Sequence, residues 1–204
     1  MKVFLWKQKQ LFEVNKKEEL NENTILISDY EEEMIEETLE ANGHLWIENN
    51  EIKWSGPAPD DVYDWDNDTK EWVKNQERYA SKLAEKQEHA WEGIKAERLK
   101  QTTSGVYVPS VDKVFHTDDV SVIQYNNIGN MIALGNYEPI QWKVMDNTWI
   151  TMTEEVFKDL QIAMVQNTNR IYQVAEVHKA KMMELDNPED YDYSEGWNII
   201  DPSN

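Results

Sequence analysis

The apolar positions in the first third of the chain change spacing every few residues, a pattern typical of short strands and turns. Residues 45–47 and 52–54 are two apolar stretches on either side of a polar tetrad, which predicts a β-hairpin. A second hairpin is predicted where the turn at residues 66–68 separates Trp65 from Trp72. We therefore expect small antiparallel sheets in this part of the chain.

Two segments of the first half have helical spacing instead. Residues 29–42 begin with acidic residues and carry apolar residues three and four apart, so Asp29 is the expected N-cap and Gly43 the terminator. Residues 75–100 are rich in strong helix formers and predict a connector helix between two domains. The apolar stripe of this helix runs through Tyr79, Leu83, Ala90, Trp91, Ile94 and Leu99.

The second half also mixes strands with helices. Short strands are predicted at residues 105–109 and from residue 114, and a third hairpin at residues 140–152, where apolar positions alternate on both sides of an Asp-Asn turn.

Two helices are expected among these strands. One is capped by Thr117 or Asp118 and ends at Gly135, and a long one is capped by Thr153 and runs to about residue 185. The apolar face of the long helix consists of Val156, Leu160, Met164, Ile171, Val174, His178 and Met182.

The whole pattern predicts an α+β protein. It consists of a small, aromatic-rich N-terminal domain of strands and turns at residues 1–74, the connector helix at 75–100, a C-terminal domain of short antiparallel strands with two or three helices at 101–185, and an acidic tail at 186–204. The tail is too polar to form a core of its own, so we expect it to stay loose or to dock on a partner.

Charge narrows the choice of partners. Lys and Arg number 20 against 40 Asp and Glu, so the formal charge of −20 repels phosphate backbones and argues against nucleic acid and anionic membranes as partners. The chain has no Cys, which removes disulfides, thiolate zinc sites and cysteine nucleophiles. The first residues do not form a secretion signal, and no apolar run approaches the roughly 18 residues of a membrane helix.

Candidate metal chemistry is weak. Asp64, Asp66 and Asp68 alternate like the start of a calcium loop, but Thr69 stands where the loop needs Gly and Asn75 where it needs Glu. A turn stabilised by the aspartate side chains explains the three acids better. The histidines lie far apart in the sequence and in no ligand spacing, so we expect no metal and no cofactor.

No catalytic motif stands out either. Glycoside hydrolysis needs two carboxylates beside one bond, and the pair Glu154 and Glu155 is better explained by its place at a helix N-terminus. The sequence has no nucleophile elbow, phosphate loop or dinucleotide fingerprint. We therefore expect a protein that is not an enzyme.

Aromatic residues are the best candidates for binding, because Trp and Tyr are enriched where interfaces concentrate their binding energy. Core packing accounts for most of them, and Trp91, Trp142 and Trp149 are assigned to the second domain's core. The N-terminal tryptophans crowd a small domain, so one or two are expected to face a partner. The candidate partner-binding residues are Trp46, Trp54, Trp65, Trp72, Tyr191, Tyr193 and Trp197.

Two runs in the second half carry a family resemblance. They are AWEGIKAERLKQTTSGVYVPSVDKVFHTDDVSV at residues 90–122 and IALGNYEPIQWKVMDNTWITMTEEVFKDLQIAMVQNTNRIYQ at residues 132–173. With their GVYV strand and W-K-x-x-D-x-x-W-I hairpin, they resemble the domain of unknown function commonly found at the C-terminus of bacteriophage tail fibre and tail fibre assembly proteins. The segment PDDVYDWDNDTKEWVKNQE at residues 59–77 is similar to the aromatic-rich segment that precedes this domain.

The resemblance implies a non-enzymatic phage tail protein that binds the tail fibre or other tail proteins. It would act either as an assembly chaperone in the host cytoplasm or as a structural adaptor retained in the virion tail. The expected connector helix could also support a homo-oligomer, although its apolar stripe is not a sustained heptad. The alternative is a tail-associated protein that binds or cleaves glycans during receptor recognition.

Overall fold

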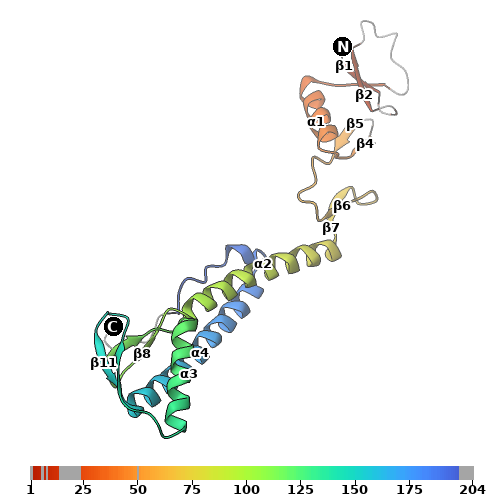
Figure 1. The fold of residues 1–204 in the computed structure, drawn as a ribbon. Helices are drawn as coiled ribbons and strands as arrows, with labels where there is room; N and C mark the ends of the chain where they lie inside the picture. Colours follow the sequence, from red (N-terminus) through yellow and green to blue (C-terminus); the bar gives the residue numbers. More distant parts are fainter. Residues whose placement is uncertain (1, 6, 8, 14–23, 50, 198–204) are drawn as a thin grey trace. The chain divides into compact units, whose positions relative to one another are not determined.

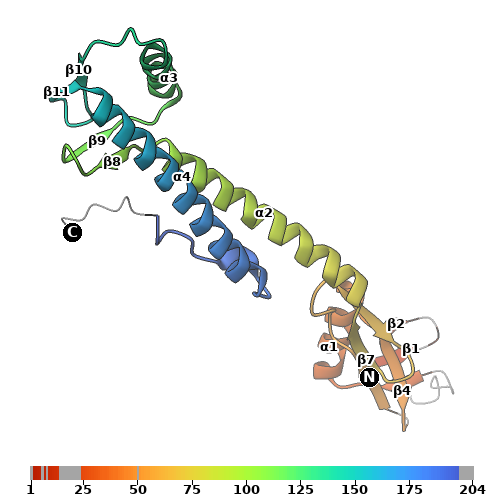
Figure 2. The same ribbon diagram turned by 90° about the horizontal axis from the view of Figure 1, so that it is seen from below.

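The computed structural model describes residues 2–5, 7, 9–13, 24–49 and 51–197 (Figures 1 and 2). It confirms a mixed α and β protein, with four α-helices and several small antiparallel sheets in the described part. The chain divides into two compact units, Met1–Ser81 and Lys82–Asn204, and each has hydrophobic core residues of its own. Residues 198–204 of the expected tail lie outside the described residues.

The first unit opens with a three-stranded antiparallel sheet in the order β2-β1-β3. Its strands are β1 (Lys2–Leu5), β2 (Gln10–Glu13) and β3 (Thr24–Leu26). The core of the unit forms where Phe4 of β1 meets Ile35 and Ile52, each at most 3% exposed. A single strand residue thus joins the sheet to a helix and to a hairpin that follow later in the chain.

Helix α1 (Asp29–Glu40) starts one residue earlier than the sequence predicts. Ser28, not Asp29, is the N-cap: its Oγ accepts a hydrogen bond from the Glu31 backbone N–H at 3.2 Å, and the Glu31 carboxylate accepts one from the Ser28 N–H at 2.7 Å. This reciprocal pair is a capping box, whose motif is Ser or Thr followed three residues later by Glu or Gln, and Ser28 with Glu31 fits it.

Both hairpins expected in the first unit are present. The first pairs β4 (Leu45–Glu48) with β5 (Glu51–Trp54), and the second pairs β6 (Tyr63–Asp66) with β7 (Glu71–Lys74). The strands pair on either side of the predicted turns, with Glu48 opposite Glu51 in the first hairpin and Asp66 opposite Glu71 in the second.

Two long helices form the frame of the second unit. Helix α2 (Gln76–Thr102), whose first residues belong to the first unit, lies alongside α4 (Glu154–Met183) in both views (Figures 1 and 2). Ile94 of α2 is fully buried against Ile171 and Ala175 of α4. The apolar face predicted for the long final helix is therefore the face that packs.

The other elements of the second unit surround the first half of α4. They are β8 (Val106–Val108), β9 (Lys113–Phe115), α3 (Asp119–Ala133), β10 (Ile140–Lys143) and β11 (Trp149–Met152). Phe115, Tyr125, Met152 and Leu160, each fully buried, form the centre of this core. Burial also raises the pKa of Tyr125 to about 12, which keeps its phenol neutral.

The caps of α3 and α4 agree with the sequence. Asp118 accepts a hydrogen bond from the Ser121 N–H at 3.0 Å, and Thr153 accepts one from the Val156 N–H at 3.3 Å. The hydroxyl of Thr117, the other candidate, is buried and accepts from the Gly105 N–H at 2.8 Å. Gly135 follows α3 with a φ of +69°, as expected of a residue just past a helix.

Two expectations about the second unit are wrong. Trp149 was expected in the core, but its side chain is 63% exposed, because it lies on the outer face of the β10–β11 hairpin. Residues 186–197 were expected to be loose or to dock on a partner, but they pack on the chain itself through Trp197, which is 1% exposed. A short 3-10 helix, Pro188–Asp190, forms part of this segment.

The described helices were also compared with the requirements of a membrane span. None of them combines the length and the apolar character needed to cross a bilayer.

Candidate interaction surfaces

Trp65 lies at the centre of an aromatic cluster in the first unit, formed with His44, Trp46 and Trp72. The His44 ring stacks on Trp65 with centroids 4.9 Å apart and planes 6° apart. Trp72 and Trp46 contact Trp65 at centroid distances of 5.3 and 5.5 Å. All four side chains are half-buried, so the cluster lies neither in a sealed core nor on an open surface.

Strand register explains why these rings meet. Trp65 and Trp72 are directly opposite each other in the β6–β7 hairpin, and Trp46 lies on the face of β4 opposite to Leu45, which faces the core. An isolated two-stranded hairpin is marginally stable, so the aromatic cluster supplies the packing that joins the two hairpins. Trp46, Trp65 and Trp72 therefore stabilise their own unit, and only their exposed edges are available to a partner.

His44 is the titratable member of the cluster. Burial among the rings, followed by repulsion from the charge of Lys9, lowers its pKa below the ordinary value of 6.5. The ring that stacks on Trp65 is therefore neutral at pH 7. The pKa of His44 can therefore be measured to test whether its ring stacks in the cluster.

Trp54 lies apart from the cluster. It packs against the core residues of its unit and meets Tyr30, which is 62% exposed, edge to face at 6.2 Å. Trp54 also borders a hollow of about 420 Å³ whose other walls come from α1 and the β4–β5 hairpin. The lining residues are Glu31, Trp46, Glu51, Ile52, Lys53 and Trp54.

Two of the three aspartates that resemble a calcium loop, Asp64 and Asp66, use their carboxylates in local hydrogen bonds. The Asp66 carboxylate accepts from the backbone N–H groups of Asp68 and Thr69 at 2.7 and 3.3 Å, and these bonds lower its pKa. Asp64 binds the side chains of Asn75 and Arg78. Within the described residues, no group of three or more acidic or His side chains is arranged to hold a metal ion.

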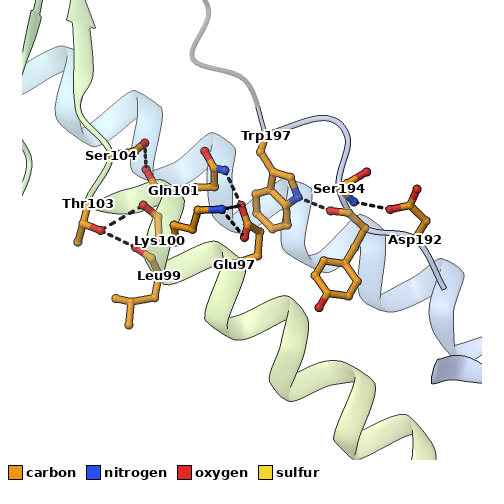
Figure 3. A network of polar contacts seen from close by, with 10 residues as sticks. Glu97, Leu99, Lys100, Gln101, Thr103, Ser104, Asp192, Ser194 and Trp197 are labelled. Carbon is orange, nitrogen blue, oxygen red and sulfur yellow. Dashed lines mark hydrogen bonds and ion pairs between the residues drawn. The ribbon is translucent and has the colours of Figure 1, made fainter. Parts of the chain in front are cut away.

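The C-terminal aromatic candidates are used inside the second unit. Figure 3 shows Trp197 beside α2, with its indole N–H donating to the Tyr193 carbonyl oxygen. Tyr193 itself lies against Gly93, where a Cβ would come within 2.7 Å of the tyrosine oxygen. Because Trp197 is buried, it is not available to a partner, contrary to the expectation from the sequence.

His178 connects this segment to α4, and it is a hydrogen-bonded, buried residue as its place on the apolar face indicates. Its Nδ1 lies 2.9 Å from the Tyr191 hydroxyl, and its Nε2 lies 2.9 Å from the Glu195 carbonyl oxygen. The imidazole also stacks on Trp197 at 5.2 Å. Tyr191 is thus half-buried and hydrogen-bonded to His178, and burial raises the pKa of its phenol.

Helix α3 carries an exposed apolar surface that is not among the binding residues expected from the sequence. Val120, Ile123, Met131 and Leu134 lie on its outer face with 65, 60, 45 and 70% of their side chains exposed. Their spacing of three, eight and three residues places them on one side of a helix. The inner face of α3, with Tyr125 and Ile128, is buried as predicted.

A signal for this outer face is present in the sequence. Residues 120–137 contain no Asp, Glu, Lys or Arg, although 29% of all residues in the chain are charged. Contiguous exposed apolar patches mark interaction sites in soluble proteins. We name the four exposed side chains Val120, Ile123, Met131 and Leu134 the α3 stripe.

Comparison with known proteins places the second unit in a family. The family described as Domain of unknown function (DUF4376) matches residues 85–195, more than half of the 204 residues. The match begins within α2 and extends beyond α4 to residue 195. The family's domain therefore includes the α2–α4 helix pair, the core around α3 and most of the C-terminal segment. No curated protein and no solved structure matches the chain. The chain therefore belongs to the family of the domain of unknown function DUF4376.

Proposed function

We propose that this chain is a non-enzymatic bacteriophage tail protein that binds a tail fibre through the α3 stripe. The observation that carries the proposal is the stripe itself: four apolar side chains, each 45 to 70% exposed, within residues 120–137, which contain no charged residue in a protein of net charge −20. An exposed apolar face costs solubility unless a partner covers it. The resemblance to tail fibre and tail fibre assembly proteins supplies the partner.

Two modes of action remain within this proposal. A chaperone in the host cytoplasm would cover apolar surface of the fibre through the α3 stripe until the fibre assembles, and would then leave. A structural adaptor would keep the same contact in the finished tail. The half-buried cluster around Trp65 and the exposed Tyr30 offer the first unit a second, smaller contact in either mode.

Co-expression with the tail fibre of the phage that carries the gene tests the proposal. The wild-type chain is expected to co-purify with the fibre, and the double variant Ile123→Glu with Leu134→Glu is expected to lose it, because two buried carboxylates at an apolar contact cost several kcal/mol. The matched control is Val177→Glu, which puts the same charge on a side chain of α4 that is 53% exposed. Retention of the fibre by the double variant contradicts the proposal.

Mass spectrometry of purified, infectious virions separates the two modes. A fixed copy number of this chain per virion supports the adaptor. Absence from virions, with loss of infectious particles when the gene is removed, supports the chaperone.

A second candidate function is glycan binding, and the hollow beside Trp54 favours it. Aromatic rings and carboxylates around about 420 Å³ can stack on a sugar and accept its hydroxyl groups. Hydrogen bonds from Ser28 lower the pKa of Glu31, which is opposite to what a general acid in glycoside hydrolysis requires, so the candidate is binding without cleavage. Titration with oligosaccharides of the host surface, followed by tryptophan fluorescence in wild type and Trp54→Ala, tests it.

A further inference from the structure

A second surface of the helix pair α2 and α4 combines aromatic rings with cations. The Lys179 Nζ atom lies 4.7 Å from the centroid of the Trp91 ring, and the Arg98 guanidinium carbon lies 4.4 Å from the centroid of Tyr172. Trp91 and Arg98 are two turns apart on α2, and Tyr172 and Lys179 are two turns apart on α4. The two contacts therefore bridge the helices in the same register. We name these four residues the cation–aromatic patch.

The patch lies on a flank of the helix pair that the C-terminal segment, as far as residue 197, does not cover. The C-terminal segment covers the other flank, where Tyr193 meets Gly93 and Trp197 stacks on His178. On α4, Tyr172 and His178 differ by six residues, or about 240° of rotation, which places them on different sides of the helix. Tyr172 is 48% exposed.

Neither cation of the patch forms an ion pair with the described residues, although the Glu176 carboxylate lies one turn from Lys179. Nearby Lys95 pairs with Glu88 and Glu92, whereas Arg98 and Lys179 form no ion pair with any of the residues that the structure describes. This is unexpected where acids outnumber bases 40 to 20. A guanidinium held over a ring still has five N–H donors, and those not directed at the ring can bind a carboxylate.

We propose that the cation–aromatic patch binds an acidic peptide segment of a partner protein. Arg98 and Lys179 bind its carboxylates, and the exposed ring of Tyr172 takes an apolar side chain beside them. Arg, Trp and Tyr are the residues that contribute most where protein interfaces concentrate their energy. The site goes beyond the proposed fibre contact, since it lies on α2 and α4 instead of α3 and needs no fibre to be tested.

The experiment is an NMR titration of the full chain with a capped peptide of alternating Glu and Leu. The reference peptide replaces each Glu by Gln and so keeps the apolar groups without the charge. The Trp91 indole N–H and the Arg98 side-chain N–H signals are expected to shift with the Glu peptide only. Equal shifts with both peptides, or none at these two groups, overturn the proposal.

Variants of matched charge locate the binding. Arg98→Gln and Lys179→Gln are each expected to weaken the peptide affinity by about fivefold, the order expected of an exposed ion pair. Lys158→Gln removes the same charge from an exposed position of α4 that has no aromatic partner in the described structure, and is expected to change nothing. An equal loss in Lys158→Gln would mean that only net charge matters and would overturn the site.

A gain of affinity gives an independent check. Glu176 is exposed one turn from both Tyr172 and Lys179, so its carboxylate repels an acidic peptide at the patch. Glu176→Gln is expected to strengthen binding by about twofold or more, and weaker binding in this variant counts against the patch.

Discussion

At the scale of single residues, the neutral His44 ring is the most direct test of the aromatic cluster. We expect its NMR titration to have a midpoint below 6.5, because burial among Trp46, Trp65 and Trp72 opposes protonation. The pKa of His44 is lower in the folded state than in the unfolded state. Its contribution to the free energy of unfolding is therefore fully present above pH 6.5 and is lost as the pH falls through the folded-state pKa. A midpoint at or above 6.5 would contradict the stacked arrangement.

Gly105 occupies a position that no other residue fits. Its φ is +113°, and a Cβ there would lie 3.0 Å from the Phe115 carbonyl oxygen and 2.5 Å from the Met145 sulfur. Gly105→Ala is expected to cost about 3 kcal/mol of unfolding free energy, from backbone strain and from the displaced hairpin. Urea unfolding followed by far-UV circular dichroism measures this cost, because most of the helical signal comes from the long helices of the second unit, which contains Gly105.

Gly135 is the matched control for this substitution. It also has a positive φ, of +69°, but a Cβ there meets no atom within 4 Å. Gly135→Ala is therefore expected to cost only about 1 kcal/mol. Equal costs for the two alanines would show that crowding at Gly105 is unimportant.

At the scale of elements, the C-terminal segment is a structural part of the helix pair. Trp197→Ala is expected to destabilise the second unit by about 3–5 kcal/mol, the cost of removing a fully buried aromatic side chain. Trp149→Ala removes a tryptophan that is 63% exposed and is expected to cost about 1 kcal/mol or less. Urea unfolding of both variants decides the matter, and similar costs would mean that the segment does not pack as described.

These elements also show what the sequence can predict. The hairpins are specified locally, since apolar stretches such as residues 45–47 and 52–54 are separated by a few turn-forming residues. The caps Asp118 and Thr153 depend on the three residues that follow them, so they too are predictable. The cap of α1 was misplaced because the capping box of Ser28 and Glu31 was overlooked.

The wrong expectations for Trp197 and Trp149 have a different cause. Burial of Trp197 depends on Ile171 and Ala175, which come from a helix far earlier in the chain, so the polar composition of residues 186–197 gives no sign of it. Alternation in the β10–β11 hairpin identifies two faces but not which of them meets the core, and Trp149 lies on the outer one. The α3 stripe was missed because the same helix has a strong apolar inner face.

At the scale of the whole molecule, the two proposed binding surfaces differ in their charge. The net charge of −20 favours solubility and keeps like-charged copies apart. The α3 stripe lies in residues 120–137, which carry no charge, and the cation–aromatic patch holds two cations that form no ion pair with the described residues. The expected homo-oligomer through the connector helix gains no support from α2, because α4 of the same chain covers Ile94 at the centre of its apolar stripe.

Salt is expected to affect the two surfaces differently. Raising the ionic strength from about 0.05 to 0.5 M screens the Arg98 and Lys179 contacts with an acidic peptide and weakens that binding. Apolar contacts at the α3 stripe are not weakened in this way. Affinities for the Glu–Leu peptide and for the tail fibre, measured across this range, distinguish charge-dependent binding from apolar binding. An equal loss of affinity for both would contradict an apolar fibre contact at the α3 stripe.

Site-specific photo-crosslinking in infected cells tests directly whether the α3 stripe contacts the tail fibre. A photo-reactive amino acid replaces Ile123 in the α3 stripe or, as the control, the exposed Val177 of α4, and mass spectrometry identifies the protein captured after illumination. We predict that the tail fibre is captured from position 123 and not from position 177. Capture of only a second copy of this chain or of a host protein at position 123, or no capture at all, would contradict fibre binding through the α3 stripe.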